Sequence, residues 1–205
     1  MLDRELREVK EKMLTPLVTQ VDERVHPNII TLIGLGFGLA AGVAALLRLY
    51  PLALLLWGVN RLLDGLDGTV ARERAQQSDL GAYLDILIDF VVYAFIPVML
   101  AVGINTREIY LMLALLLSSF YINAASWMYL AALLEKRKHG ATSQAEMTSV
   151  TMPRGLVEGM ETILFFTLFL LLPAQAAFLF GTMAALTLLT VIQRVYWAWG
   201  ALRDQ

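Results

Sequence analysis

The chain has 205 residues, of which 58% are hydrophobic and 17% are charged, with no cysteine and a formal net charge of -2. Soluble globular proteins are less apolar and about a quarter charged, so this composition predicts an integral membrane protein with room for about six spans of ~20 residues. The lack of cysteine excludes disulfide scaffolds, thiolate zinc sites and cysteine nucleophiles. The near-neutral charge, without a long basic run, gives no support to nucleic-acid binding.

Residues 1–25 mix charged and apolar residues and are predicted to form an amphipathic helix that lies in the membrane interface. The segment has no continuous apolar stretch and no small-residue cleavage site, so a signal peptide is a poor interpretation. Its apolar residues recur three or four positions apart, which is the spacing of one helix face: Leu2, Leu6, Val9, Met13, Leu17 and Val21.

Six apolar segments follow, and they predict an all-α, polytopic membrane protein with six transmembrane helices. Arg48 and Pro51 mark the turn between the first two. Residues 162–193 carry no charge, and as one helix they would be about 48 Å long against a hydrocarbon core of ~30 Å, so we expect a break at Pro173. The chain shows no repeat, so residues 1–205 are predicted to be a single domain with spans at 29–47, 51–72, 80–104, 109–134, 154–172 and 174–199.

The distribution of basic residues predicts the orientation of these spans. Only Arg48 and Arg107 fall on the turns of one side. The segments of the other side hold Arg4, Arg7, Lys10, Lys12, Arg24, Arg72, Arg74, Lys136, Arg137, Lys138, Arg154 and Arg203. The positive-inside rule therefore places both termini of the chain on the cytoplasmic side of the cell membrane.

Four aspartates lie on the second and third predicted spans, where each carboxylate is costly. Asp64 and Asp67 are three residues apart and Asp85 and Asp89 are four apart, so each pair projects from one helix face near the cytoplasmic surface. A charge at mid-membrane costs roughly 2.5–3.5 kcal/mol, and Arg61 alone cannot balance four of them. Two divalent cations would, and ligands that are all oxygens favour Mg²⁺ or Mn²⁺. An ion-coupling site in a transporter is the alternative, and the spacing alone does not decide.

The residues between the two pairs favour the metal interpretation. Gly68, Ala71 and Gly81 are small residues beside the carboxylates, where a missing side chain lets a bulky ligand approach the backbone. Arg72 adds a permanent cation that suits a phosphate. A metal-bridged diphosphate needs this combination, whereas an ion-coupled transporter does not.

The motif that these residues form resembles the signature of the CDP-alcohol phosphatidyltransferases, a family of integral membrane enzymes. It runs Asp64-x-x-Asp67-Gly68-x-x-Ala71-Arg72 and, after eight residues, Gly81-x-x-x-Asp85-x-x-x-Asp89. Pro27-Asn28-x-x-Thr31 is similar to the segment that leads into the family's first span. The resemblance extends over the whole chain, since family members have six spans, an N-terminal interfacial helix and a cytoplasmic site.

The resemblance implies phospholipid biosynthesis by a one-step displacement on a CDP-lipid, usually CDP-diacylglycerol. Asp64, Asp67 and Asp85 would hold two metal ions, Mg²⁺ or Mn²⁺, that clamp the diphosphate. Asp89 would also contact metal and act as the general base on the hydroxyl of a small polar alcohol, which attacks the β-phosphate and releases CMP. Ser78 is equally suited to cap the third span. The implied contacts of the CDP-lipid are Asn28, Thr31, Gly68, Ala71, Arg72, Ser78 and Gly81.

The acceptor alcohol is left open by the sequence. Arg154 and Arg194 resemble basic residues that line the acceptor pocket where family members use a phosphorylated acceptor, which favours glycerol 3-phosphate, inositol or inositol phosphate. Glu158 and Glu161 would repel a phosphate and suit a neutral or amine-bearing alcohol, although Arg154 is also spaced to pair with Glu158. The basic residues 136–138 are predicted to contact anionic lipid.

The resemblance also implies a homodimer. Gly34, Gly38 and Gly42 recur four residues apart on the first span, which is the spacing that lets another helix approach closely. This glycine stripe suits a contact between two copies and packing within one chain equally well.

Overall fold

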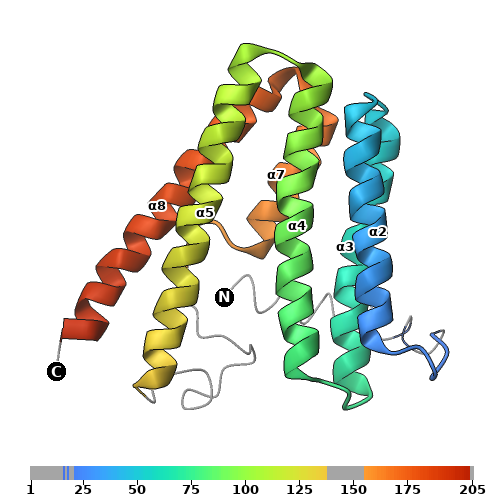
Figure 1. Cartoon of the computed structure of the whole chain (residues 1–205), viewed down its shortest axis with the longest axis vertical. Helices are drawn as coiled ribbons and strands as arrows, with labels where there is room; N and C mark the ends of the chain where they lie inside the picture. The colour runs from blue at the N-terminus through green and yellow to red at the C-terminus, as the bar shows by residue number, and fades with distance from the viewer. Residues whose placement is uncertain (1–15, 17, 19–20, 138–154, 204–205) are drawn as a thin grey trace. The chain divides into compact units, whose positions relative to one another are not determined.

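The computed structural model describes residues 16, 18, 21–137 and 155–203, which form helices and turns without a β-strand (Figure 1). The all-α prediction is therefore confirmed for these residues. The predicted interfacial helix over residues 1–25 lies mostly outside them, and residues 21–26, which are described, form turns instead of helix. The helices are α2 (Pro27–Leu46), α3 (Tyr50–Glu73), α4 (Asp79–Ile104), α5 (Arg107–Lys136), α7 (Gly159–Leu171) and α8 (Ala176–Arg203), with a 3₁₀ turn at Pro173–Gln175.

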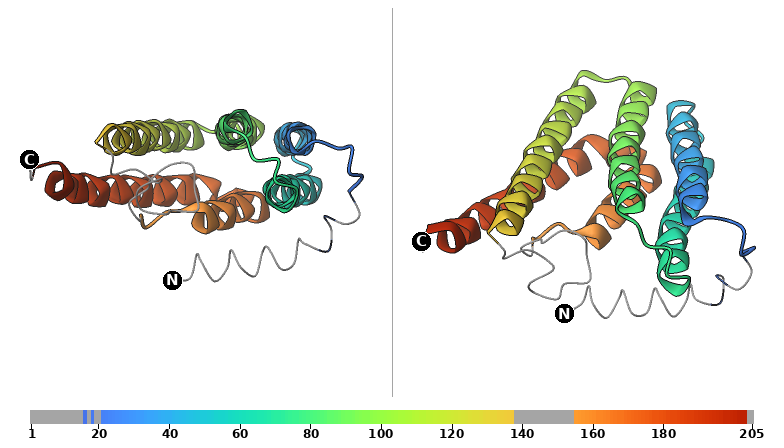
Figure 2. Two further views of the ribbon diagram at one scale, coloured as in Figure 1. Left: turned by 90° about the horizontal axis from the view of Figure 1, so that it is seen from below. Right: turned by 60° about the horizontal axis from the view of Figure 1, so that its bottom comes forward.

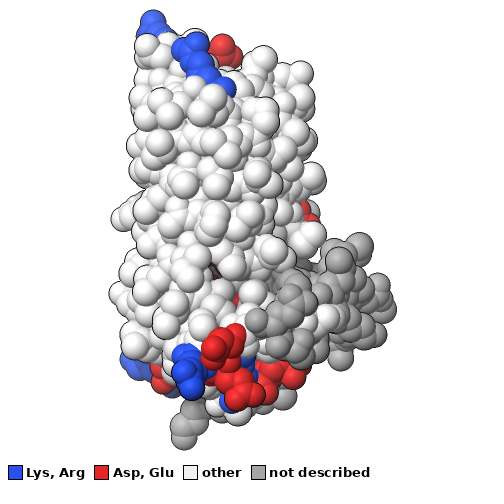
Figure 3. Space-filling model, turned by 90° about the vertical axis from the view of Figure 1, so that its right-hand side faces the viewer, with Lys and Arg blue, Asp and Glu red and all other residues white. Residues whose placement is uncertain are grey.

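The helices have the composition of a multi-pass membrane protein. Helix α7 is apolar but only 13 residues long, and α3 carries charged residues in its second half. Figure 3 shows a broad belt with very few charged atoms between charged groups at the two ends of the face in view. Each of the six predicted spans overlaps one helix. Within the described part of the chain, four segments are long and apolar enough to cross a membrane, namely Pro27–Leu46, Asp79–Ile104, Arg107–Lys136 and Pro173–Arg203.

Prolines and a capping serine set the helix boundaries that matter for the site. Pro27 and Pro51 stand in the first turns of α2 and α3, where a missing amide hydrogen costs no helical hydrogen bond. The Ser78 hydroxyl caps α4 by accepting a hydrogen bond from the Gly81 amide at 3.1 Å. The chain turns at Pro173 between α7 and α8, so the break predicted there is confirmed.

The chain divides into two compact units. The first is Met1–Asn105 with Leu170–Pro173, and the second is Thr106–Phe169 with Ala174–Gln205. In the first unit α2 packs against both α3 and α4, as the end-on view of Figure 2 shows. In the second unit α5 packs along α8. All four aspartates of the motif therefore belong to the first unit.

The glycine stripe of α2 packs inside the first unit. A Cβ atom on Gly42 would lie 2.5 Å from the Phe95 ring of α4, and one on Gly38 would lie 2.6 Å from Val92 of the same helix. A Cβ atom on Gly34 would lie 3.6 Å from α3. The missing side chains thus let α2 approach both neighbours closely, which is the packing role that the sequence allowed.

The turns before α2 are fastened to the end of α3. The Arg74 guanidinium donates hydrogen bonds to the carbonyl oxygens of Val21 at 2.8 Å and Val25 at 3.1 Å. The buried apolar residues Ile30 of α2 and Val70 of α3 belong to one hydrophobic cluster, and Val21 and Val25 pack against it. These contacts fix where α2 begins, and with it the segment that carries Asn28 and Thr31.

Candidate active site

The hairpin of α3 and α4 brings the two pairs of aspartates to the same level. Asp67 lies six residues before the end of α3 at Glu73, and Asp85 lies six residues after the start of α4 at Asp79. At 1.5 Å per residue, each is about 9 Å from its helix end. Because a short turn joins these ends, the carboxylates of the two helices face a common region.

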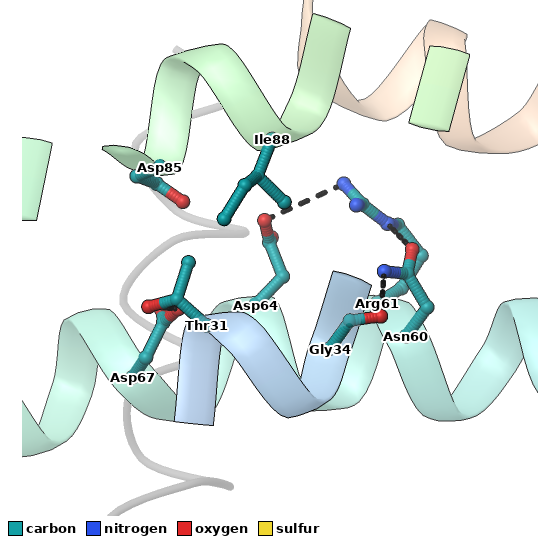
Figure 4. Close-up of a pocket in the computed structure, with 8 residues that line it drawn as sticks. All are labelled: Thr31, Gly34, Asn60, Arg61, Asp64, Asp67, Asp85 and Ile88. Carbon is teal, nitrogen blue, oxygen red and sulfur yellow. Dashed lines mark hydrogen bonds and ion pairs between the residues drawn. The ribbon is translucent and has the colours of Figure 1, made fainter. Parts of the chain in front are cut away.

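Three of the four predicted metal ligands line one pocket of the first unit (Figure 4). Asp64 and Asp67 reach it from α3 and Asp85 reaches it from α4. The fourth, Asp89, is not among the lining residues, but it contacts Arg61, which is. The complete lining consists of Thr31, Gly34, Asn60, Arg61, Asp64, Asp67, Asp85 and Ile88.

Asp67 is the most buried of these carboxylates, with 5% of its surface exposed. Its Oδ2 accepts a 2.6 Å hydrogen bond from the Thr31 hydroxyl of α2, and its Oδ1 accepts one from the Gly68 amide. Thr31 was predicted to contact the CDP-lipid, and the structure places it on a carboxylate of the pocket. The α2 helix therefore contributes directly to the acidic site.

Arg61 joins carboxylates of both helices. Its guanidinium binds Asp89 at 2.8 Å and lies 3.5 Å from Asp64. It also donates to the Asn60 side chain at 2.9 Å and to the Tyr93 hydroxyl at 2.8 Å. Asn60 and Tyr93 were not predicted as site residues, although Tyr93 follows Asp89 by one helical turn, a spacing that could have indicated it.

The donor chemistry of the pocket fits a hard divalent cation. Carboxylate and hydroxyl oxygens from Asp64, Asp67, Asp85 and Thr31 meet there, and Mg²⁺ and Mn²⁺ prefer such ligands. In the described parts of the chain, no three Asp, Glu, His or Cys side chains form a group that would hold an ion in the observed conformation. Asp67 instead accepts the Thr31 hydrogen bond, and Arg61 pairs with Asp64 and Asp89.

Three of the predicted CDP-lipid contacts, Asn28, Ser78 and Gly81, lie together where α2 and α4 begin. A Cβ atom on Gly81 would lie 3.1 Å from the Ser78 hydroxyl and 3.2 Å from the Asn28 side-chain oxygen. The backbone is therefore bare beside two polar side chains. Ser78 caps α4 in this structure, which is the structural role that the sequence also allowed.

Gly68, Ala71 and Arg72 lie together on the last turns of α3. A Cβ atom on Gly68 would lie 3.3 Å from the Arg72 guanidinium, so the arginine folds back over the glycine. Its Nη2 also lies 3.4 Å from the Thr69 hydroxyl. The predicted cation thus lies one helical turn after Gly68 and five residues after the buried Asp67.

The residues predicted for the acceptor belong to the second unit, and Arg154 lies outside the described residues. Glu158 accepts a 2.9 Å hydrogen bond from the Gly155 amide, and Glu161 accepts one of 3.0 Å from the Glu158 amide. Both carboxylates therefore satisfy backbone groups where α7 begins.

Arg194 of α8 is 6% exposed, so its guanidinium is buried. It donates to Asn123 at 2.8 Å and to Ser126 at 3.3 Å, both on α5. Its Nε is buried, and no residue in the described part of the chain accepts a hydrogen bond from it. A buried donor of this kind suits an anionic ligand.

The fold and the site define a helical membrane protein with an acidic pocket between consecutive helices. The sequence profile described as CDP-alcohol phosphatidyltransferase matches residues 24–199. The chain therefore belongs to the CDP-alcohol phosphatidyltransferase family, and it is a membrane transferase of that class. Family membership decides the question left open by the aspartates in favour of the enzyme and against the ion-coupled transporter.

Several proteins are similar to the chain in sequence. Inner membrane protein YnjF of Escherichia coli is 35% identical over 197 residues, which cover 96% of this chain and 94% of that protein. A bifunctional IPC transferase and DIPP synthase of Thermococcus kodakarensis is 29% identical over 93% of this chain and 43% of that protein. An archaetidylinositol phosphate synthase of Aeropyrum pernix is 39% identical over 41% of this chain and 44% of that protein.

Two solved structures of the phosphatidylinositol phosphate synthase of Mycobacterium tuberculosis have a similar fold. The one with CDP-DAG bound has a TM-score of 0.68 at 17% identity, covering 94% of each chain. The one in complex with manganese and citrate has a TM-score of 0.69 at 17% identity, covering 93% of this chain and 88% of that one. At this identity the likeness establishes the fold.

Proposed function

We propose that this enzyme transfers a phosphatidyl group from a CDP-lipid, CDP-diacylglycerol, to the hydroxyl of a small polar alcohol and releases CMP in phospholipid biosynthesis. The observation that carries this proposal is the placement of Asp64, Asp67 and Asp85 around one pocket, with Asp89 held beside it by Arg61. The related fold that binds CDP-DAG in the Mycobacterium tuberculosis enzyme supports the choice of donor.

The four aspartates divide the work of this reaction. Asp64, Asp67 and Asp85 would hold two divalent cations, Mg²⁺ or Mn²⁺, which when bound offset the charge of the diphosphate. Asp89 takes the proton of the acceptor hydroxyl. The acceptor oxygen then forms a bond to the β-phosphorus, the bond from that phosphorus to the CMP oxygen breaks, and CMP leaves with the bonding electrons. The manganese complex of the Mycobacterium tuberculosis enzyme supports metal use.

Residues at the beginnings of α2 and α4 and at the end of α3 would bind the cytidine diphosphate. The close approach of Asn28, Ser78 and Gly81 leaves bare backbone next to side-chain oxygens, which suits a nucleotide lying against it. Arg72 would contact a phosphate oxygen. The predicted set of contacts is completed by Thr31, Gly68 and Ala71.

For the acceptor we propose a phosphorylated polyol, with inositol phosphate ahead of glycerol 3-phosphate. The buried Arg194, whose Nε has no hydrogen-bond partner among the described residues, supports an acceptor phosphate. The Aeropyrum pernix relative is an archaetidylinositol phosphate synthase and the Mycobacterium tuberculosis protein is a phosphatidylinositol phosphate synthase, which supports inositol phosphate in particular. Glu158 and Glu161 give an amine-bearing acceptor little support, because both accept hydrogen bonds from the backbone.

We propose six spans, with both termini and the active site on the cytoplasmic side, and a homodimeric assembly. The charge bias between the two sides supports this orientation. The homodimer rests on the family resemblance, since the glycine stripe of α2 packs within one chain.

The first experiment measures CMP release by the purified enzyme in detergent with CDP-diacylglycerol and Mn²⁺. The acceptor panel contains inositol phosphate, glycerol 3-phosphate, inositol and an amine-bearing alcohol. We expect release with inositol phosphate and loss of activity with EDTA. Failure to release CMP with every acceptor would refute the proposed reaction.

Asp89→Asn tests the general base in the same assay. This variant is expected to bind CDP-diacylglycerol normally and to lose turnover by at least ~100-fold, since general-base catalysis is typically worth 10²–10⁴-fold. Asp79→Asn is the matched control, because Asp79 is an exposed aspartate on the first turn of the same helix. Unchanged turnover in Asp89→Asn would remove Asp89 from the role of base.

A further inference from the structure

Arg61 has more contacts than a simple counter-ion needs. Its side chain is 9% exposed. Each of its three nitrogens donates to a different residue: Nε to Asn60 at 2.9 Å, Nη1 to Tyr93 at 2.8 Å and Nη2 to Asp89 at 2.8 Å. A planar guanidinium bound on every nitrogen has one orientation, so Arg61 is fixed within the protein.

Aromatic rings enclose the same guanidinium. Its central carbon lies 4.8 Å from the ring centre of Trp57 and 5.2 Å from that of Tyr93. The two rings pack edge to face, with centres 6.3 Å apart, and Trp57 is 2% exposed. Cation–π contacts of this kind favour a charged guanidinium at this place and limit its movement.

Asn60 ties this arrangement to the backbone of α2. Its side-chain nitrogen donates to the Gly34 carbonyl at 2.8 Å, while its side-chain oxygen accepts from Arg61. Asn60 is 1% exposed. A continuous series of contacts therefore runs from Gly34 of α2 through Asn60 and Arg61 of α3 to Asp89 of α4.

We propose that Arg61 is a positioning residue that fixes the carboxylate of Asp89 for proton transfer. This inference rests on the proposed function, in which Asp89 is the base. Arg61 holds Asp89 at 2.8 Å but stands 3.5 Å from Asp64, so it binds the base more closely than the neighbouring metal ligand. Arg61 thereby holds Asp89 beside the pocket that the other three aspartates line.

The test compares Arg61→Gln, Arg61→Lys and Tyr93→Phe with the wild type in the CMP-release assay. Arg61→Gln is expected to lower kcat by about 10- to 100-fold, the range for losing a group that orients a functional ligand, with KM for CDP-diacylglycerol within about 3-fold of the wild type. Arg61→Lys keeps the charge and is expected to recover part of kcat. Tyr93→Phe keeps the ring and is expected to cause a smaller loss of kcat.

A second measurement separates positioning from misfolding. The number of CDP-diacylglycerol molecules bound per protein, measured without acceptor, should stay at the wild-type value in all three variants. Arg48→Gln is the matched control, because Arg48, in the turn between α2 and α3, also binds α4, through a 2.8 Å hydrogen bond to the Gly103 carbonyl at the opposite end of the unit. This control should keep the wild-type kcat.

The outcomes distinguish the two proposals. If the wild-type enzyme releases no CMP with any acceptor, the proposed reaction is refuted, whatever the variants do. An active wild type with an equally active Arg61→Gln refutes the positioning role. The positioning role is also refuted if the loss appears in KM, or if the binding stoichiometry falls in Tyr93→Phe together with kcat.

Discussion

At the scale of single residues, the site depends on uncharged partners as much as on its carboxylates. Thr31 lies on α2, yet its hydroxyl makes a 2.6 Å hydrogen bond to Asp67 of α3. A buried carboxylate needs such donors, because burial without hydrogen bonds is costly. The Thr31 hydroxyl therefore helps to hold the Oδ2 of Asp67 in place, while the Gly68 amide binds its Oδ1.

Thr31→Val removes this hydrogen bond and keeps the shape of the side chain. We expect the Mn²⁺ concentration for half-maximal activity to rise about 10- to 100-fold, the range for losing a hydrogen bond that orients a metal ligand. Titration of activity with Mn²⁺ measures the change. Thr182→Val is the control, since the Thr182 hydroxyl donates to the Phe178 carbonyl of its own helix in the second unit. Equal Mn²⁺ requirements in the two variants would contradict the role of Thr31.

At the scale of elements, the first unit depends on close contact between helix backbones. A Cβ atom on Gly103 of α4 would lie 2.8 Å from the Leu46 carbonyl oxygen and 2.9 Å from that of Ala45. These atoms belong to the backbone and cannot rotate away. The contact therefore sets how closely α2 and α4 approach each other at the end of the unit away from the aspartates.

Gly103→Ala is expected to destabilise the protein by about 1–3 kcal/mol, the usual cost of overpacking a tight contact. The thermal unfolding midpoint in detergent should fall accordingly. Gly36→Ala is the matched control on α2, because, apart from the local helix backbone, no atom of the described residues lies within 4 Å of a Cβ atom placed there. The control should keep or slightly raise the midpoint, since alanine favours helix over glycine. A midpoint for Gly103→Ala at or above that of the control would show that the contact can relax.

The sequence predicted the helices well because apolar length and proline position decide them locally. The break at Pro173 and the start at Pro51 both follow from the missing amide hydrogen. The end of the N-terminal helix was predicted at residue 25, yet residues 21–26 form turns. Tertiary contact with Arg74 holds these turns, and the local pattern of apolar residues contains no information about it.

The site was predictable in its charges but not in its contacts. The spacing of the aspartates shows which of them share a helix face, and three of them do line one pocket. The three hydrogen-bond partners of Arg61 come from two helices, and their meeting depends on how the helices are rotated against each other. Glu158 illustrates the same limit, because its carboxylate accepts a hydrogen bond from a backbone amide of its own turn.

At the scale of the whole molecule, the lack of native cysteine makes the membrane orientation directly testable. Gln76 and Gln175 are both exposed glutamines in turns, the first between α3 and α4 and the second between α7 and α8. With cytoplasmic termini, a membrane-impermeant maleimide should label Gln175→Cys in intact cells and Gln76→Cys only after the cells are permeabilised. Labelling of Gln76→Cys in intact cells would contradict the proposed orientation.

The location of the motif within the chain has a consequence for the order of assembly during synthesis. The contact of Arg74 with Val21 spans 53 residues and that of Thr31 with Asp67 spans 36, and both lie in the first unit. The segment before α2 leaves the ribosome first but cannot be fixed until the end of α3 has followed it. Once Asp89 and the rest of α4 have been inserted, the acidic pocket has all its residues. It can therefore form in the bilayer while α5, α7 and α8 are still being translated.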